Sequence, residues 1–289
     1  MQSIEGVYVA NVTPFRDDAS LSVDVDSYLA HASWLSEMGV RGIVPFGTNG
    51  EGPSVALHEK LRVLEALFAR DLSFQVIPAV MQGNLPDTLE MVATLEDYPV
   101  TAVLVLPPYF FKPASAEGLK RFFQPVLEAT SHPVVVYHAN YAVPVPEEVV
   151  TDLPVWGVKD AAGEPGYAET VLQSGKGVLI ATEDDLWQRL NLGAQGVISA
   201  LANFIPEEIL EMNRMVTEGD ETGGKTLAEK LQQARAMTKE YASAAVLKRL
   251  AEARLGAPMG TVRPPFVPLP ADYDPEPVLS ASLSSPAGS

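Results

Sequence analysis

The segment that decides the fold of this chain is Val-Trp-Gly-Val-Lys-Asp-Ala-Ala-Gly-Glu, residues 155–164. Its apolar run ends at the cationic Lys159, and a turn that contains Gly163 follows at once. If the run is a strand of a (β/α)₈ barrel, its last side chain points into the barrel mouth, where this fold carries out its chemistry. Burial there lowers the pKa of a lysine, and the neutral amine can attack a ketone to form an imine. A surface lysine at a strand end is the alternative interpretation.

Short β-rich runs alternate with amphipathic segments along the rest of the chain. The runs are almost continuously hydrophobic, which is typical of strands covered on both faces of a parallel sheet. They lie at residues 6–10, 42–46, 74–80, 102–106, 134–137, 156–159, 178–181 and 196–199. Apolar residues at spacings of three and four predict helices between them. These helices are expected at residues 25–35, with Ser22 as a cap, and at 56–69, 87–95, 116–128, 146–152, 165–173 and 184–192, with an eighth from Pro206.

Eight strand–helix units predict the α/β class and, within it, a TIM barrel with additional C-terminal helices. A doubly wound open sheet is the competing architecture, but its dinucleotide-binding fingerprint is missing. The barrel is expected at residues 1–220, and a polar break at 218–224 precedes a helical appendage at 221–262. The appendage should hold helices at 227–241 and 244–255. A proline-rich tail at 263–289 should be extended and, toward its end, disordered.

The composition argues against several classes of protein. Its 37 acidic and 20 basic side chains among 289 residues give a formal charge of −17, which disfavours nucleic acid and anionic membrane surfaces as partners. An anionic substrate would need a local cluster of donors to overcome this charge. Cysteine is absent, so disulfides, thiolate catalysis and thiolate metal sites are excluded. We see no secretory signal and no apolar run of about 20 residues, and expect a cytoplasmic protein without membrane association.

A glycine-rich loop, Gly-Thr-Asn-Gly-Glu-Gly-Pro-Ser at residues 47–54, follows the second predicted strand directly. Glycines and small polar residues at a strand-to-helix junction let backbone N–H groups converge on an anion. The side chains of Thr48 and Asn49 can add hydrogen bonds, so the loop suits a carboxylate. A nucleotide phosphate loop is disfavoured because no Gly-Lys-Ser/Thr follows. A plain structural turn is the other interpretation.

Tyr137 ends the fifth predicted strand. A phenol in the barrel mouth can transfer a proton between an imine and a substrate hydroxyl, provided that a second group relays it. An aromatic side chain that closes the core is the alternative. His138 lies one strand step further and should point away from the barrel interior, which favours a structural role.

The other polar and aromatic segments are less specific. Glu183, Asp184 and Asp185 follow the seventh predicted strand and could act in acid–base catalysis, but an acidic helix N-terminus is favoured. The loop at 107–113, Pro-Pro-Tyr-Phe-Phe-Lys-Pro, could line the pocket or form a contact surface, and the latter is preferred. No pair of histidines has metal-ligand spacing with a carboxylate, so no metal site is expected.

Several of these signals occur in one order along the chain: Asn-Val-Thr-Pro-Phe at 11–15, Gly-Thr-Asn-Gly-Glu at 47–51, Tyr137 and Lys159. In combination they resemble the dihydrodipicolinate synthase/N-acetylneuraminate lyase family, from Gly6 to the Val-Arg-Pro-Pro segment at 262–265. The resemblance implies a TIM barrel and a class I mechanism, in which a lysine forms an imine with pyruvate or another small 2-oxo acid. It implies no metal, no organic cofactor and assembly into homodimers or homotetramers.

Carried over by position, the resemblance assigns a role to each motif. Lys159 matches the Schiff-base lysine and Tyr137 the proton-relay tyrosine. Thr48 and Asn49 match the residues that hold the substrate carboxylate, with Thr48 counted among the catalytic residues. Ile198 matches the residue whose backbone carbonyl faces the site. The other residues expected around the substrate are Gly47, Gly50, Ala181, Tyr109, Phe110 and Asn140.

Two departures bear on the substrate. Where dihydrodipicolinate synthases have a second relay tyrosine from a neighbouring subunit, this chain has Phe110, preceded by Tyr109. Five residues after the relay tyrosine, those synthases place an arginine that binds the aldehyde substrate's carboxylate, and here that position is Ala142. We therefore expect an aldolase or lyase acting on pyruvate or a 2-oxo sugar acid. Dihydrodipicolinate synthase, a 2-oxo-3-deoxy sugar acid dehydratase and a 2-oxo acid-binding barrel without turnover are the alternatives.

Overall fold

The computed structural model describes residues 3–140 and 142–283. Its described strands are all parallel and form one sheet in the order β3-β2-β1-β9-β8-β7-β6-β5-β4. The strands are β1 (Gly6–Val9), β2 (Gly42–Ile43), β3 (Gln75–Val76), β4 (Ala79–Val80), β5 (Val103–Val105), β6 (Val134–His138), β7 (Gly157–Asp160), β8 (Gly177–Ile180) and β9 (Gly196–Ser199).

The sheet closes on itself because its two outer strands are halves of one segment. β3 and β4 are separated only by Ile77 and Pro78, and they pair with β2 and β5 respectively. The Ile77 N–H donates to Ile43 O at 3.0 Å, and Pro78 O accepts from Leu104 N at 3.0 Å, so the segment bonds to both neighbours. Proline has no N–H for a continuous ladder, which explains why the strand predicted at 74–80 is divided. The predicted TIM barrel is confirmed.

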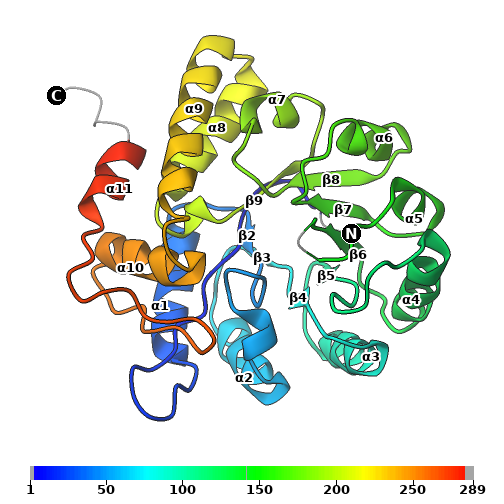
Figure 1. Cartoon of the computed structure of the whole chain (residues 1–289), viewed down its shortest axis with the longest axis horizontal. Coiled ribbons are helices and arrows are strands. Elements are labelled where there is room, and N and C mark those ends of the chain that lie inside the picture. Colours follow the sequence, from blue (N-terminus) through cyan, green and yellow to red (C-terminus); the bar gives the residue numbers. More distant parts are fainter. Residues whose placement is uncertain (1–2, 141, 284–289) are drawn as a thin grey trace.

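Helices surround the strands (Figure 1). The α-helices of the barrel are α1 (Val25–Glu37), α2 (Leu57–Phe68), α3 (Leu85–Thr94), α4 (Ala116–Glu128), α5 (Glu147–Asp152), α6 (Tyr167–Gln173), α7 (Leu186–Leu190) and α8 (Pro206–Glu218). Those after the barrel are α9 (Glu221–Met237), α10 (Ser243–Leu255) and α11 (Glu276–Ser282). Short 3₁₀ turns are η1 (Gly52–Ser54), η2 (Leu95–Asp97) and η3 (Leu201–Asn203). No helix among the described residues has the length and apolarity to cross a bilayer.

Side-chain alternation along the strands gives the molecule two apolar layers. One cluster lies between the strands and the helices and includes Val136 and Val158. The other includes Tyr137, Leu179 and Ile198 and fills the barrel interior. Because successive side chains of a strand point to opposite faces, Tyr137 of β6 and its register partner Lys159 of β7 share the interior face.

Three details differ from the sequence-based expectations. The cap of α1 is Asp24, whose side chain accepts a hydrogen bond from Ser27 N, so the cap predicted at Ser22 is wrong.

Helix α9 begins at Glu221, inside the segment at 218–224 that was expected to be a break. Gly224 there serves close packing, because a Cβ at this position would lie 2.0 Å from a ring carbon of Trp187. Within the tail expected to be extended, α11 forms and packs on α9. The disordered end expected at 284–289 lies outside the described residues.

Candidate active site

The amine of Lys159 lies inside the barrel mouth. The residue is 4% exposed near the end of β7, and its Nζ lies 4.0 Å from the centre of the Tyr137 ring. The turn after it is held by Asp160, which accepts hydrogen bonds from Ala162 N and Gly163 N at 3.1 Å each and pairs with Arg189. The strand end is thereby fixed from the outside of the barrel while the lysine points inward.

The glycine-rich loop brings Thr48 to the same place. The Thr48 Oγ1 lies 3.3 Å from the Tyr137 Oη. A turn closes the loop, since Glu51 N donates to Thr48 O at 3.1 Å and Gly52 N donates to Gly47 O at 3.0 Å. Gly50 is required for close approach, because a Cβ there would lie 2.8 Å from Asn11 O.

These residues surround a cavity of about 370 Å³ at the carboxyl ends of the strands. Seven residues that the sequence placed around the substrate line it: Thr48, Asn49, Tyr137, Asn140, Lys159, Ala181 and Ile198. Gly47 and Gly50 shape the loop but do not line the cavity. The size of this space suits a small polar substrate.

The aromatic loop does not reach this cavity. Phe110 is 79% exposed and contacts Phe111 edge to face, with ring centroids 5.3 Å apart, so it does not line the cavity of the single chain, and its role beside the substrate stays a prediction. Tyr109 instead lines a neighbouring apolar cavity of about 270 Å³, together with Leu106, Ala142 and Phe266. Because Thr48 lines both cavities, the two lie on either side of it.

Glu183 holds a position that the capping interpretation missed. It is 2% exposed, lines the cavity and accepts a hydrogen bond from Ser199 Oγ at 2.7 Å. The helix that follows, α7, has Asp185 as its N-cap, so the acidic residues do precede a helix N-terminus, but no side chain caps this helix by a hydrogen bond. The buried carboxylate is directed to the cavity by β9 instead.

Two cations from the C-terminal appendage also line the cavity, and no local pattern in the sequence indicates either of them. Arg235 and Lys239 lie one helical turn apart, at the end of α9 and just beyond it. The Arg235 Nε lies 3.5 Å from Glu183 Oε2, and its Nη1 donates to the hydroxyls of Thr238 and Ser243. They supply part of the local positive charge that the acidic chain as a whole lacks.

His138 has the structural role expected of it. Its Nδ1 accepts a hydrogen bond from Val145 N at 3.1 Å, and its ring stacks on Tyr167 at a centroid distance of 4.1 Å. Burial lowers the pKa of His138, which favours the neutral ring. Among residues 3–140 and 142–283 there is no group of three or more His, Asp or Glu side chains placed to hold a metal ion.

A sequence profile of the dihydrodipicolinate synthetase family matches residues 3–283. The chain belongs to this family. It is 31% identical over 237 residues to the 4-hydroxy-tetrahydrodipicolinate synthase of Methanococcus maripaludis, across 79% of this chain and 81% of that protein. A solved dihydrodipicolinate synthase superimposes with a TM-score of 0.85 at 28% identity, covering 96% and 98% of the two chains. The N-acetylneuraminate lyase of Proteus mirabilis has the same fold, with a TM-score of 0.88 at 23% identity over 97% and 98%.

Membership confirms the class of enzyme. The chain is an enzyme of the class I aldolase and lyase family, whose members bind pyruvate or another 2-oxo acid. They react through a lysine Schiff base without a cofactor.

Proposed function

We propose that this protein is an aldolase or lyase that cleaves or forms a carbon–carbon bond in a 2-oxo sugar acid, through an imine on Lys159. The observation that carries the proposal is the buried amine of Lys159, 4.0 Å from the Tyr137 ring, in a cavity that the Thr48 loop also lines. A buried amine loses its proton more readily than an exposed one, which makes it a nucleophile.

Each step has a residue in reach of the cavity. The neutral amine attacks C2 of the 2-oxo acid, and loss of water leaves a protonated imine. Thr48 and Asn49 hold the substrate carboxylate. The imine withdraws electrons, so the bond between C3 and C4 breaks, which leaves an enamine and releases C4 as the aldehyde of the second product. The C4 hydroxyl proton passes to the phenolate of Tyr137, which gave its own proton to the water lost in imine formation. Protonation of C3 and attack of water on the imine then release pyruvate and the amine.

The other polar side chains of the cavity support a hydroxylated substrate. Glu183 and Asp184 can accept hydrogen bonds from hydroxyl groups, and Arg235 and Lys239 can donate to them or bind an anionic terminus. The alternative activity, synthesis of 4-hydroxy-tetrahydrodipicolinate, is the one named for the Methanococcus relative. It is less well supported because Ala142 is buried where those synthases carry an arginine.

Assembly into a homodimer or homotetramer is part of the proposal. Tyr109, Phe110 and Phe111 are all exposed, and a subunit contact would remove this apolar surface from water. Sedimentation at micromolar concentration tests this, and a monomer would contradict it. The cytoplasmic location stays a prediction.

Trapping with borohydride tests the central step. Incubation with pyruvate and borohydride should add a stable label to Lys159, mapped by peptide mass. Lys159→Ala should abolish the label, whereas Lys239→Ala, which removes another lysine of the same cavity, should keep it. A label that persists in folded Lys159→Ala would assign the nucleophile elsewhere. No label in the wild-type chain from any of many 2-oxo acids would overturn the proposal.

The substrate is tested by turnover. Cleavage of 2-oxo-3-deoxy sugar acids or sialic acid, followed by release of pyruvate, would support the lyase. Turnover of pyruvate with aspartate semialdehyde alone would favour the synthase, and labelling without turnover of any of these compounds would favour a binding protein.

A further inference from the structure

Glu51 ends the loop that carries Thr48 and Asn49, and its backbone is in an unfavourable conformation. Its φ of 51° and ψ of 35° lie in the left-handed region, which residues with a Cβ seldom adopt. Its N–H donates to Thr48 O at 3.1 Å, and its carbonyl accepts from Ser54 N at 2.8 Å. Such a conformation persists only where the surrounding structure holds it. We therefore expect contacts of the Glu51 side chain to restrain its backbone.

Both carboxylate oxygens of Glu51 are bound by residues that follow the barrel. The Glu51 Oε1 accepts from Lys248 Nζ at 2.6 Å, and Oε2 accepts from the backbone N–H of Arg263 at 3.0 Å. Glu51 and Lys248 are each 2% exposed, so water does not compete for this pair. The partners lie 197 and 212 positions further along the chain. Removing either partner from a buried pair is costly because the other charge is left unpaired.

The partners of Glu51 are themselves anchored. The Lys248 Nζ also donates to Thr261 O at 2.6 Å and lies 4.4 Å from the centre of the Phe15 ring. The guanidinium of Arg263 lies 4.2 Å from the same ring and binds both carboxylate oxygens of Glu59. Helix α10 and residues 261–263 thus form a fixed frame beside the loop.

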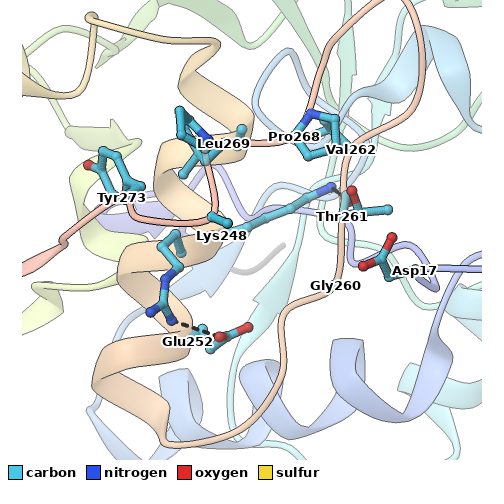
Figure 2. A pocket seen from close by; sticks show the side chains of 13 residues that line it. Asp17, Lys248, Glu252, Gly260, Thr261, Val262, Pro268, Leu269 and Tyr273 are labelled. Carbon is cyan, nitrogen blue, oxygen red and sulfur yellow. Dashed lines mark hydrogen bonds and ion pairs between the residues drawn. The ribbon is translucent and has the colours of Figure 1, made fainter.

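Figure 2 shows how Lys248 reaches its partners. Its side chain extends from α10 along a cavity of about 320 Å³, and its amino group points toward Thr261. Burial lowers the pKa of Lys248 to about 8. Lys248, which lines this third cavity, thus connects it to Glu51 of the loop that carries Thr48.

We propose that Glu51 is a positioning residue, which ties the carboxylate-binding loop to α10 and residues 261–263 and so holds Thr48 and Asn49 ready for the substrate. The inference rests on the proposed function, because it assumes that this loop receives the carboxylate of a 2-oxo acid. Hydrogen-bond donors that are already oriented before the anion binds do not have to be reordered, so binding loses less conformational entropy. The C-terminal appendage then contributes to the active site in two ways. It holds the carboxylate-binding loop in place, and its residues Arg235 and Lys239 line the cavity.

The test measures how borohydride labelling of Lys159 depends on pyruvate concentration. In Glu51→Gln and Lys248→Met, the half-saturating pyruvate concentration should rise by about ten- to a hundredfold, because a displacement of about 1 Å has effects of this size. The labelling rate at saturation should change far less, because Lys159 and Tyr137 stay in place. The control is Arg249→Met, which changes the next residue of α10. Arg249 pairs with Glu252 of its own helix at 2.8 Å, so this change should leave both quantities unaltered.

The outcomes separate this inference from the proposed function. An unlabelled wild-type chain would overturn the imine chemistry. A labelled wild type, together with a folded Glu51→Gln that saturates at the wild-type concentration, would refute positioning and leave Glu51 a purely structural role.

Hydrogen exchange on the wild type is the second measurement, and it applies if both variants fail to fold. Saturating pyruvate should slow exchange in residues 47–52 and in 259–263 together. Slowing confined to 47–52 would contradict the link.

Discussion

The hydroxyl oxygen of Thr48 lies 3.3 Å from the phenol oxygen of Tyr137, across a barrel mouth in which Lys159 approaches the same ring from the other strand. The three side chains come from the ends of two strands and one loop. One hydroxyl can therefore pass a proton to the other while the amine holds the substrate. This contact also links the group that we propose binds the carboxylate to the group that we propose transfers the proton.

Removing the phenol should separate imine formation from turnover. Tyr137→Phe should still be labelled by pyruvate and borohydride, because Lys159 is intact. Turnover should fall by about 10²–10⁴-fold, the usual contribution of a general acid–base group. Tyr167→Phe is the matched control, because the buried Tyr167 hydroxyl has no hydrogen-bond partner in the described structure. Normal turnover in Tyr137→Phe would show that another group moves the proton.

The Thr48 hydroxyl should contribute mainly to binding. Thr48→Val keeps the shape of the side chain but loses a hydrogen bond to a charged group, which contributes about 1.5–3 kcal/mol. We therefore expect KM for the 2-oxo acid to rise by about ten- to a hundredfold. Thr48→Ser keeps the hydroxyl and should stay near the wild type. Steady-state kinetics check both variants, and equal losses in the two would point to packing in place of the hydrogen bond.

Glu183 should act on the far end of the substrate. Glu183→Gln retains the volume but removes the charge that faces Arg235 at 3.5 Å. We expect kcat/KM for a 2-oxo sugar acid to fall by at least about tenfold, as for other lost polar contacts. Labelling by pyruvate alone should be unchanged, because the proposed imine formation uses Lys159, Tyr137 and the Thr48 loop and does not need Glu183. If labelling by pyruvate fell to the same extent, the residue would act on the shared chemistry of Lys159.

Stability should fall in mild acid because of His31. This residue is buried, its Nε2–H donates to Asn203 O at 3.0 Å, and burial lowers its pKa from 6.5 to about 4. Between these values the unfolded chain binds a proton that the folded chain does not, so the free energy of unfolding decreases as the pH falls from 6.5 toward 4. The difference corresponds to about 3 kcal/mol.

Urea titrations at pH 7.5 and 4.5 measure this effect. In His31→Gln, which keeps a donor for Asn203 O, the difference between the two pH values should be smaller by about 2–3 kcal/mol. An unchanged difference would assign the acid sensitivity to other groups, such as the Glu59 carboxylate that pairs with Arg263.

The sequence predicted the barrel because its signals are local. Hydrophobic runs of strand length alternate with helical periodicity, and a side chain's face follows from its position in the run. Tyr137 and Lys159 each lie one residue before the end of neighbouring strands, so their placement in the mouth needed only the strand order. The same alternation placed His138 outside the barrel, where it stacks on Tyr167.

Local sequence patterns do not reveal the role of a residue whose partners lie far away in the sequence. Glu183 follows a strand and precedes a helix, so a capping role was the natural interpretation, yet Ser199 and Arg235 hold it in the cavity. Phe110 matched a site position in sequence but is exposed in the single chain.

By itself, the sequence determined the fold class and placed Lys159 and Tyr137 at the barrel mouth, because periodicity and side-chain alternation are properties of neighbouring residues. Only the tertiary structure decided which segments complete the site. It brought Arg235 and Lys239 of the appendage to the cavity, and Lys248 and Arg263 to Glu51. These contacts join residues up to 212 positions apart, and they depend on how α9 and α10 pack on the closed barrel, which no short stretch of sequence records.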